Sequence, residues 1–179
     1  RGRGRDVAAG TAVRQRAVKE VGSGEYRTFG KVDPPRRGED DRQGVIEALA
    51  SGLMDIVVSA HAPAPAEDKR LPYDEAAPGA VGLQTLLPAL LAFHHEGRIP
   101  LIDLMRTVTS RPAELLGLPA GRLAKGAPAD LVLCDLNAPM IVDLADLKSK
   151  SKNSPFDGRR LQGVVRTTLV DGRVVYQAD

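Results

Sequence analysis

His61 stands at the end of an apolar run, in the stretch IVVSAHAPAPAEDK that spans residues 56–69. A buried strand that ends in a polar, proline-rich loop is how many α/β enzymes present catalytic groups. A histidine in such a loop could bind a metal ion or carry a proton. Its neighbours Ala60, Ala62 and Ala64 can do neither, because an alanine side chain has no polar atom. A purely structural role for His61 in the turn remains the alternative.

A second loop of this kind, KVDPPRRGED, carries Asp33 and Arg36. Both side chains could face a ligand if the loop lies at the same end of a sheet as His61. Asp33 could instead brace the rigid turn at Pro34 and Pro35, since aspartate often bonds to the backbone of a turn. The residues alone leave these two interpretations open.

The remaining polar residues do not predict a metal site. His94 and His95 are neighbours at the end of an expected helix, and successive helical side chains point about 100° apart, so they cannot converge on one ion. Their position suits the negative end of a helix dipole. The single cysteine, Cys134, lies in the apolar segment DLVLCDL and is expected to be a buried structural thiol. A zinc site needs at least three converging ligands, which this set does not provide.

Composition predicts a soluble cytoplasmic protein. The 179 residues contain no apolar run near the ~20 that a membrane span requires, no apolar segment typical of a secretory signal, and only one cysteine. Part of the positive charge falls in residues 1–20, which hold six arginines and lysines. Such an arm could bind nucleic acid through phosphates, but it lacks aromatic residues that stack on bases. The chain begins with Arg1 rather than Met, which favours a fragment or a displaced start.

The order of expected elements is that of an α/β protein with a β-rich end. A strand followed by a rigid loop is expected in residues 25–34, and a buried parallel strand in residues 53–59. The pattern predicts helices in residues 38–52, 82–97, 101–110 and 112–118. From about residue 121 the chain alternates as antiparallel strands do, with a hairpin turn at Asp171-Gly172.

Six segments, taken together and in this order, resemble the C-terminal part of a dihydroorotase, a member of the amidohydrolase superfamily. They extend from about Gly24 to Tyr176 and read KVDPPRRGEDDR, IVVSAHAPAPAEDK, GAVGLQTLLP, SRPAELLGL, GRLAKGAPADLVLCD and LKSKSKNSPFDGRRLQGVVRTTLVDGRVVY. The first and last of them favour dihydroorotase over hydantoinase or allantoinase, which remain alternatives.

The resemblance implies the C-terminal portion of a metal-dependent (β/α)8 barrel, followed by a small β-sandwich-type domain. We therefore expect a basic arm, disordered or non-native, in residues 1–22, the last strand–helix units of the barrel in residues 23–120, and part of the β domain in residues 121–179. The family binds zinc and interconverts carbamoyl-aspartate and dihydroorotate in pyrimidine biosynthesis. A metal-bound hydroxide attacks the cyclic amide, and a loop aspartate both ligates the metal and carries the proton.

The resemblance places several residues of this chain at functional positions. Ala60 occupies the position of the catalytic, metal-ligating aspartate, and His61 matches the residue that follows it. The other positions that contact substrate in the family correspond to Asp33, Ala64, Pro78 and Gly79. The family's earlier metal-binding histidines and first six strand–helix units have no counterpart. This chain is therefore expected to be truncated and non-catalytic, with no intact metal site.

The partners expected from the resemblance are dihydroorotate or carbamoyl-aspartate, and a second copy of the chain. Inactive dihydroorotase-like chains also hold aspartate carbamoyltransferase in a complex, which makes a scaffold role the main alternative. Membrane association is not expected, and nucleic-acid binding remains the weakest of the possibilities.

Overall fold

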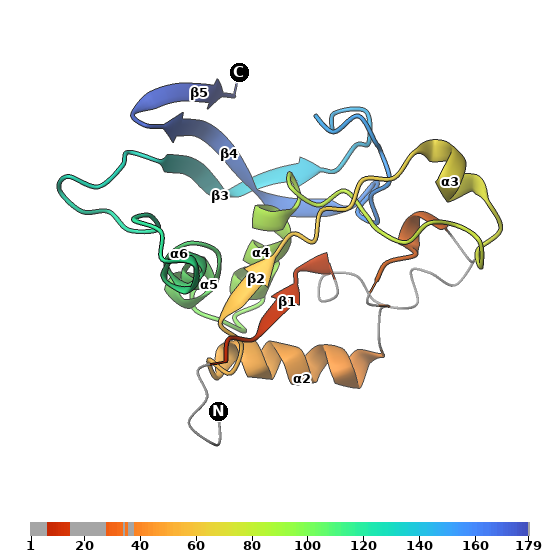
Figure 1. The fold of residues 1–179 in the computed structure, drawn as a ribbon, viewed down its shortest axis with the longest axis horizontal. Coiled ribbons are helices and arrows are strands. Elements are labelled where there is room, and N and C mark those ends of the chain that lie inside the picture. The colour runs from red at the N-terminus through yellow and green to blue at the C-terminus, as the bar shows by residue number, and fades with distance from the viewer. Residues whose placement is uncertain (1–6, 15–27, 34, 36–37, 179) are drawn as a thin grey trace.

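The computed structural model describes residues 7–14, 28–33, 35 and 38–178 (Figure 1). Strand β1 (Gly10–Ala12) lies parallel to β2 (Ile56–Val58), with Gly10 opposite Ile56. The pairing continues one residue further, where the Val13 amide donates to the Val58 carbonyl at 3.0 Å. The expected strand in residues 53–59 is confirmed, and it is parallel. It is not buried on both faces, because Val58 is 43% exposed and β1 is the one strand beside β2 among the described residues.

Residues 11–14 are buried, which differs from the arm expected over residues 1–22. Val13 is 1% exposed and Arg14 is 4% exposed. The reason is that the short apolar segment around Ala12 and Val13 pairs with β2, whereas the sequence interpretation gave more weight to the surrounding arginines. Residues 1–6 and 15–22 of that arm lie outside the described residues.

The described residues include four helices of seven residues or more: α2 (Glu39–Ala50), α4 (Leu86–His95), α5 (Leu101–Val108), which packs against β2, and α6 (Ser110–Leu116), which packs against α5. All four were expected from the sequence. Acidic residues in the first turn of α2 suit the positive end of its dipole, and Gly52 lies beyond its end at φ +72°. Pro88 falls in the first turn of α4, where a missing backbone N–H costs no helical hydrogen bond.

The segment after the gap at residues 15–27 is not a strand where it is described. Thr28–Gly30 form a short 3-10 helix, η2, and a five-residue helix, α3 (Ala66–Arg70), packs beside it. The strand expected in residues 25–34 is therefore wrong for its described part. The physical reason is that the carbonyls of Thr28 and Lys31 both accept hydrogen bonds from the buried ammonium of Lys69 in α3.

The C-terminal part is one antiparallel sheet in the order β3-β4-β5, formed by Leu131–Ile141, Arg160–Val170 and Arg173–Gln177. Asp171 and Gly172 both have positive φ, which confirms the expected hairpin turn. The sheet packs on α4 through β4, where the absent side chain of Gly163 leaves room for Leu91. The second sheet of a sandwich is not seen among the described residues.

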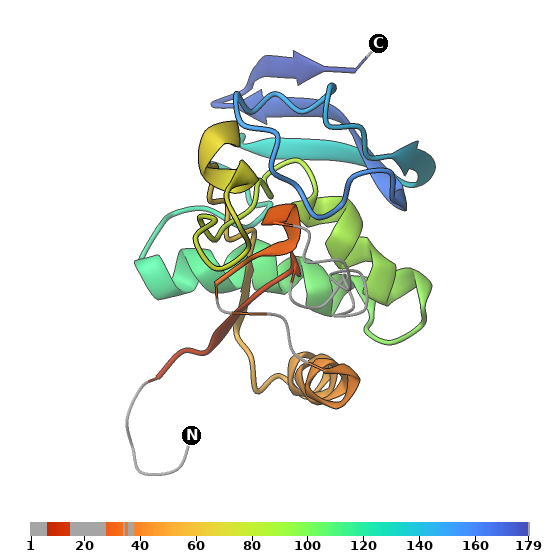
Figure 2. The ribbon, with the colours of Figure 1, turned by 90° about the vertical axis from the view of Figure 1, so that its right-hand side faces the viewer.

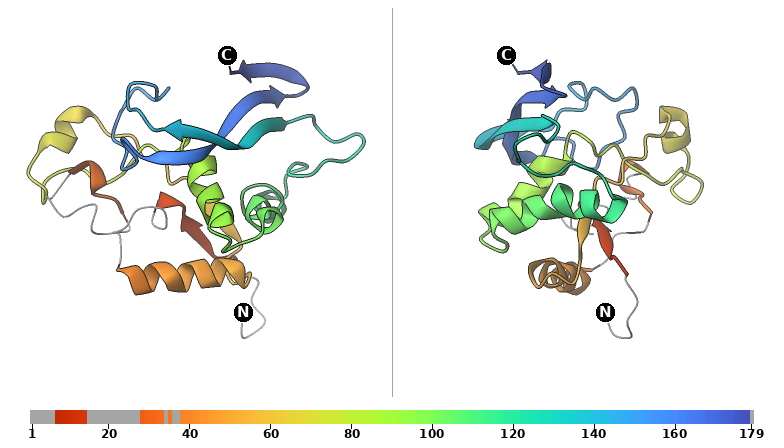
Figure 3. Two further views of the ribbon diagram at one scale, coloured as in Figure 1. Left: turned by 180° about the vertical axis from the view of Figure 1, so that it is seen from behind. Right: turned by 60° about the vertical axis from the view of Figure 1, so that its left-hand side comes forward.

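The molecule is arranged in tiers, with the β3-β4-β5 sheet above α4, α5 and α6, and α2 below (Figure 2). Its core contains buried side chains from β2, α2, α4, α5 and the segments beside β1 and the C-terminal sheet, including Val13, Ile46, Val57, Leu90, Phe93, Leu104 and Phe156. The α/β class is thus confirmed. Helix α3 and the loops beyond the carboxyl ends of β1 and β2 lie on the opposite side from α5 and α6 (Figure 3). None of the described helices is long and apolar enough to cross a membrane.

Candidate functional site

Three segments meet beyond the carboxyl ends of β1 and β2, and we call them the strand-end loops: residues 28–33, 59–65 and 77–82. The second and third are joined at His61, which forms a parallel bridge with Ala80. The Ala62 amide donates to the Ala80 carbonyl at 2.8 Å, and the Gly82 amide donates to Nδ1 of His61 at 3.2 Å. The second bond requires the His61 tautomer with its proton on Nε2. His61 therefore has a structural role in the loops, whatever else its ring does.

Ala60 has a left-handed backbone conformation, with φ +47°. Alanine rarely adopts this region, whereas aspartate and asparagine occur there several-fold more often than most residues. The backbone at position 60 thus suits an aspartate, although the side chain is a methyl group. The Ala60 carbonyl accepts a hydrogen bond from Nη1 of Arg14.

Asn153, which the sequence interpretation did not single out, ties two of the loops together. Its Oδ1 accepts from the Ala64 amide at 3.2 Å, and its Nδ2 donates to the carbonyls of Ala62 and Gly79, each at 3.2 Å. Asn153 is 2% exposed and belongs to the segment LKSKSKNSPF. A buried amide that satisfies three backbone groups stabilises the loops strongly, because each group would otherwise be desolvated without a partner.

The expected substrate contacts at Gly79 and Asp33 have different surroundings. The Gly79 amide donates to the Lys31 carbonyl at 3.0 Å, so both backbone groups of Gly79 take part in bonds within the protein. Its φ is +116°, and a Cβ there would lie 2.9 Å from Ala62. Asp33 is exposed, while its backbone carbonyl accepts from Nη2 of Arg14 at 3.0 Å. The neighbouring Arg36 lies outside the described residues.

Two buried cations lie behind the loops, and the sequence interpretation assigned neither of them. Nζ of Lys69 donates to the carbonyls of Thr28, Lys31 and Ala77 at 2.9, 3.2 and 2.8 Å. Burial, followed by the positive charges of Lys31 and Arg14, lowers the pKa of Lys69 to about 8. Arg14 follows β1 and donates to carbonyls of all three strand-end loops. No local sequence pattern marks either of them, because their partners are backbone carbonyls of other segments.

The strand-end loops do not fit a zinc ion. Zinc requires three or more nitrogen, sulfur or carboxylate ligands that converge. No three His, Cys, Asp or Glu side chains do so within the described ranges. At the loop itself, Ala60 supplies no donor and Nδ1 of His61 is taken by the Gly82 amide. The cationic groups of Arg14 and Lys69 disfavour a further positive charge nearby.

The other residues considered from the sequence lie elsewhere. His94 and His95 occupy the last turn of α4, with ring centroids 5.6 Å apart, and Nε2 of His95 is 3.0 Å from the Leu136 carbonyl. This agrees with a position at the negative end of the helix. Cys134 is half-buried in β3, and its burial, together with the charge of Asp135, raises the pKa of the thiol. A raised pKa keeps the thiol protonated and unreactive.

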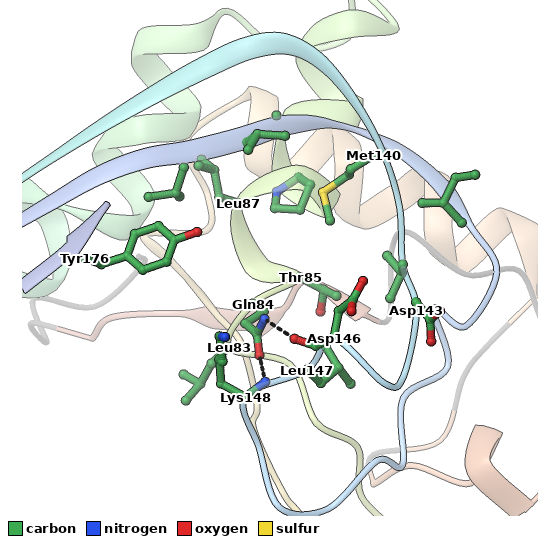
Figure 4. A pocket seen from close by; sticks show the side chains of 16 residues that line it. Leu83, Gln84, Thr85, Leu87, Met140, Asp143, Asp146, Leu147, Lys148 and Tyr176 are labelled. Carbon is green, nitrogen blue, oxygen red and sulfur yellow. Dashed lines mark hydrogen bonds between the residues drawn. The ribbon is translucent and has the colours of Figure 1, made fainter. Parts of the chain in front are cut away.

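A groove of about 500 Å³ separates the start of α4 from the C-terminal sheet (Figure 4). Leu87 and Met140 line it, and the Tyr176 ring lies at one end. Gln84 spans the other side, where its amide donates to the Asp146 carbonyl at 3.5 Å and its oxygen accepts from the Lys148 amide at 2.5 Å. The strand-end loops do not line the groove, and its surface is mainly apolar. The groove is therefore suited to contacts between apolar side chains rather than to acid–base chemistry.

Comparison with known proteins shows where this arrangement occurs. Residues 31–175 match the Amidohydrolase family. The chain is 45% identical over 154 residues to a dihydroorotase of Ehrlichia chaffeensis, and 44% identical over 155 residues to a dihydroorotase of Anaplasma phagocytophilum. These alignments cover 86% and 87% of this chain but only 34% and 35% of the relatives, so the chain spans about a third of their length.

The structural comparison agrees with the sequence comparison. An L-hydantoinase from Arthrobacter aurescens superposes with a TM-score of 0.91 at 33% identity, over 97% of this chain and 40% of that protein. A D-hydantoinase with 24% identity superposes at a TM-score of 0.87 and shows the common fold. The family match covers most of the described residues, including the loops around His61 and Asn153. The chain belongs to the amidohydrolase family.

Proposed function

We propose that the strand-end loops are one side of a dihydroorotase-like site, and that this chain alone does not hydrolyse a cyclic amide. The carrying observation is Ala60, whose left-handed backbone suits an aspartate while its side chain has no acid–base group. The similarity to dihydroorotases supports the substrate class. In this proposal β1 and β2 are neighbouring strands of a barrel, and their carboxyl ends face the substrate.

The chemistry of the loops explains the expected lack of activity. Opening a cyclic amide requires an activated water and a proton for the leaving nitrogen. The described loop residues offer backbone groups and the His61 ring, with the cations Arg14 and Lys69 buried behind them, and the exposed Asp33 is the one carboxylate among the described loop residues. At position 60 itself the alanine methyl group cannot supply the proton transfer that an aspartate there would provide. General acid–base catalysis of this kind contributes roughly 10²–10⁴-fold.

The test is a hydrolysis assay of the purified chain with zinc, using dihydroorotate and a 5-substituted hydantoin as substrates. The hydantoin is included because the L-hydantoinase similarity favours a wider class of cyclic amides. We expect rates equal to those of buffer with zinc for both substrates. Zinc-dependent turnover of either substrate would contradict the proposal, provided that the turnover disappears when gel filtration removes the protein from the sample.

A second candidate is a non-catalytic scaffold for aspartate carbamoyltransferase. The favouring observation is that Ala60 and Ala64 lack functional side chains while Asn153 and His61 still hold the loops in order. A scaffold needs the shape of the fold but not its proton-transfer group. Size-exclusion chromatography with light scattering would test it: we expect a complex of defined mass with the transferase and none with ornithine carbamoyltransferase. If the chain and aspartate carbamoyltransferase elute separately at micromolar concentrations, this role is excluded.

A further inference from the structure

Arg14 is positioned to hold the strand-end loops together. Its side chain is 4% exposed and lies directly beyond β1. Nη1 donates to the carbonyl of Ala60 and, at 3.5 Å, to that of Ala80, while Nη2 donates to the carbonyl of Asp33 at 3.0 Å. The three acceptors come from segments 19, 46 and 66 residues away in sequence. One planar group thus fixes the relative positions of all three loops.

The guanidinium stays charged in this environment. Burial lowers the pKa of Arg14, and the nearby negative charge of Asp33 partly offsets this effect. Arginine nevertheless keeps its proton in proteins, because its pKa starts well above neutrality. Nε is buried without a hydrogen-bond partner. The positive charge is therefore balanced mainly by carbonyl dipoles, which is also how protein oxygen atoms surround a bound cation.

The positive charge of Arg14 lies where it affects whether a metal ion can bind near Ala60. Nη1 touches the backbone of Ala60, the residue at which the family resemblance places a metal-ligating aspartate. A divalent cation in this place would lie beside a fixed positive charge and would lack the carboxylate of that aspartate. No three potential metal ligands converge in the described part of the chain. Both the donor set and the charge thus disagree with a metal centre at this strand end.

We propose that the guanidinium of Arg14 takes the place of a metal ion as the cation that organises the strand-end loops. The loops of this chain are then ordered without metal, and the site around Ala60 is built around a positive charge that belongs to the protein. This role in the fold does not depend on whether the chain hydrolyses a cyclic amide. The Arg14 proposal can therefore be overturned while the hydrolysis assay supports the proposed function, and the proposed function can be overturned while the Arg14 proposal stands.

The experiment combines zinc binding with hydrogen exchange. Calorimetric titration of the wild-type chain with zinc is expected to show no stoichiometric binding, and EDTA is expected to leave the thermal midpoint unchanged. In Arg14→Met, the amides of Ala62, Val81 and Gly82 are expected to exchange about tenfold faster or more, while those of β4 keep their rates. Arg111→Met, which removes an exposed arginine from α6, is the matched control and should change neither set.

Two further variants keep the test decisive. Arg14→Lys retains the charge but loses the planar fork, so intermediate loop protection is expected, and it replaces Arg14→Met if that variant does not fold. Ala60→Asp places a carboxylate beside Arg14, where an ion pair should form instead of a zinc site. Stoichiometric zinc binding by the wild type or by Ala60→Asp would overturn the proposal. Loop exchange in the folded Arg14 variants equal to that of the wild type would also overturn it.

Discussion

The backbone of Ala60 combines a conformation and a side chain that do not match. Its φ of +47° is one that alanine adopts at a cost of about 1–2 kcal/mol, because Cβ crowds the following carbonyl. The surrounding bonds hold it there: Arg14 binds its carbonyl, and the neighbouring His61 is joined to Ala80 and Gly82. The strain is local and is compensated by the loops on either side.

Ala60→Gly is therefore expected to stabilise the protein. Glycine adopts a positive φ without the steric cost, although its unfolded chain is more flexible, so we expect a net gain of about 1 kcal/mol in the free energy of unfolding. Urea denaturation followed by circular dichroism measures it. Ala62→Gly, two residues along and without a positive φ, is the control and should lower stability instead. Equal losses in both variants would show that the backbone at position 60 is not strained.

Among the elements, α3 shows how one buried charge shapes its neighbours. Lys69 is fully buried, and its ammonium holds η2, residue 31 and residue 77 around the helix. A strand-like pattern in residues 25–34 could not reveal this, because the bonds join parts of the chain that are 8 to 41 residues apart. The helices with clear apolar periodicity, α2, α4 and α5, were predictable since their signals are local. The short α3 had no such pattern.

The lowered pKa of Lys69 predicts that stability rises with pH in the alkaline range. Below about pH 8 the folded and unfolded states both bind the proton, so the cost of burying the charge is paid in full. Between about pH 8 and the ordinary lysine value of 10.5 the unfolded state binds more protons than the folded state, and the free energy of unfolding increases. The full contribution is about 3 kcal/mol, reached above that window.

The measurement is urea denaturation at intervals from pH 7 to pH 11, for the wild type and Lys69→Met. Other groups titrate in this range, including the Cys134 thiol with its raised pKa, so the difference between the two proteins isolates Lys69. The free energy of unfolding of the wild type, relative to that of Lys69→Met, should increase between about pH 8 and pH 10.5. Parallel pH profiles for the two proteins would mean that the pKa of Lys69 is not lowered. Lys148→Met, at an exposed lysine, controls for the loss of one surface charge.

For the whole molecule, the most prominent feature is the apolar surface of the C-terminal sheet. Every residue of β5 is exposed, and β5 pairs with β4 alone in the part of the chain that the structure describes. Its exposed apolar side chains are Val174, Val175 and Tyr176, and exposed apolar side chains continue on the other two strands of the sheet at Val132, Leu133 and Val170. An apolar strand with one unpaired edge favours association with another chain.

Self-association through β5 is the corresponding prediction. Sedimentation velocity of the wild type should show an average mass that rises with protein concentration. Val174→Lys places a charge on the edge strand and should reduce this rise, because charged edge residues oppose strand pairing. Val7→Lys is the matched control, since Val7 is 62% exposed but lies outside the sheet. A wild-type mass independent of concentration, or equal effects of the two variants, would contradict association through β5.

The sequence by itself determined the α/β class, four helices, the strand at residues 56–58, the hairpin turn at Asp171-Gly172 and an alanine at position 60, where the family resemblance leads us to expect a carboxylate. These features depend on local periodicity, turn chemistry or the identity of one residue. Only the tertiary structure decided that residues 10–12 pair with β2, and that Arg14, Lys69 and Asn153 hold the strand-end loops. Their roles rest on backbone carbonyls and amides contributed by distant segments. A sequence pattern carries no signal for such contacts, because every residue type presents the same backbone groups.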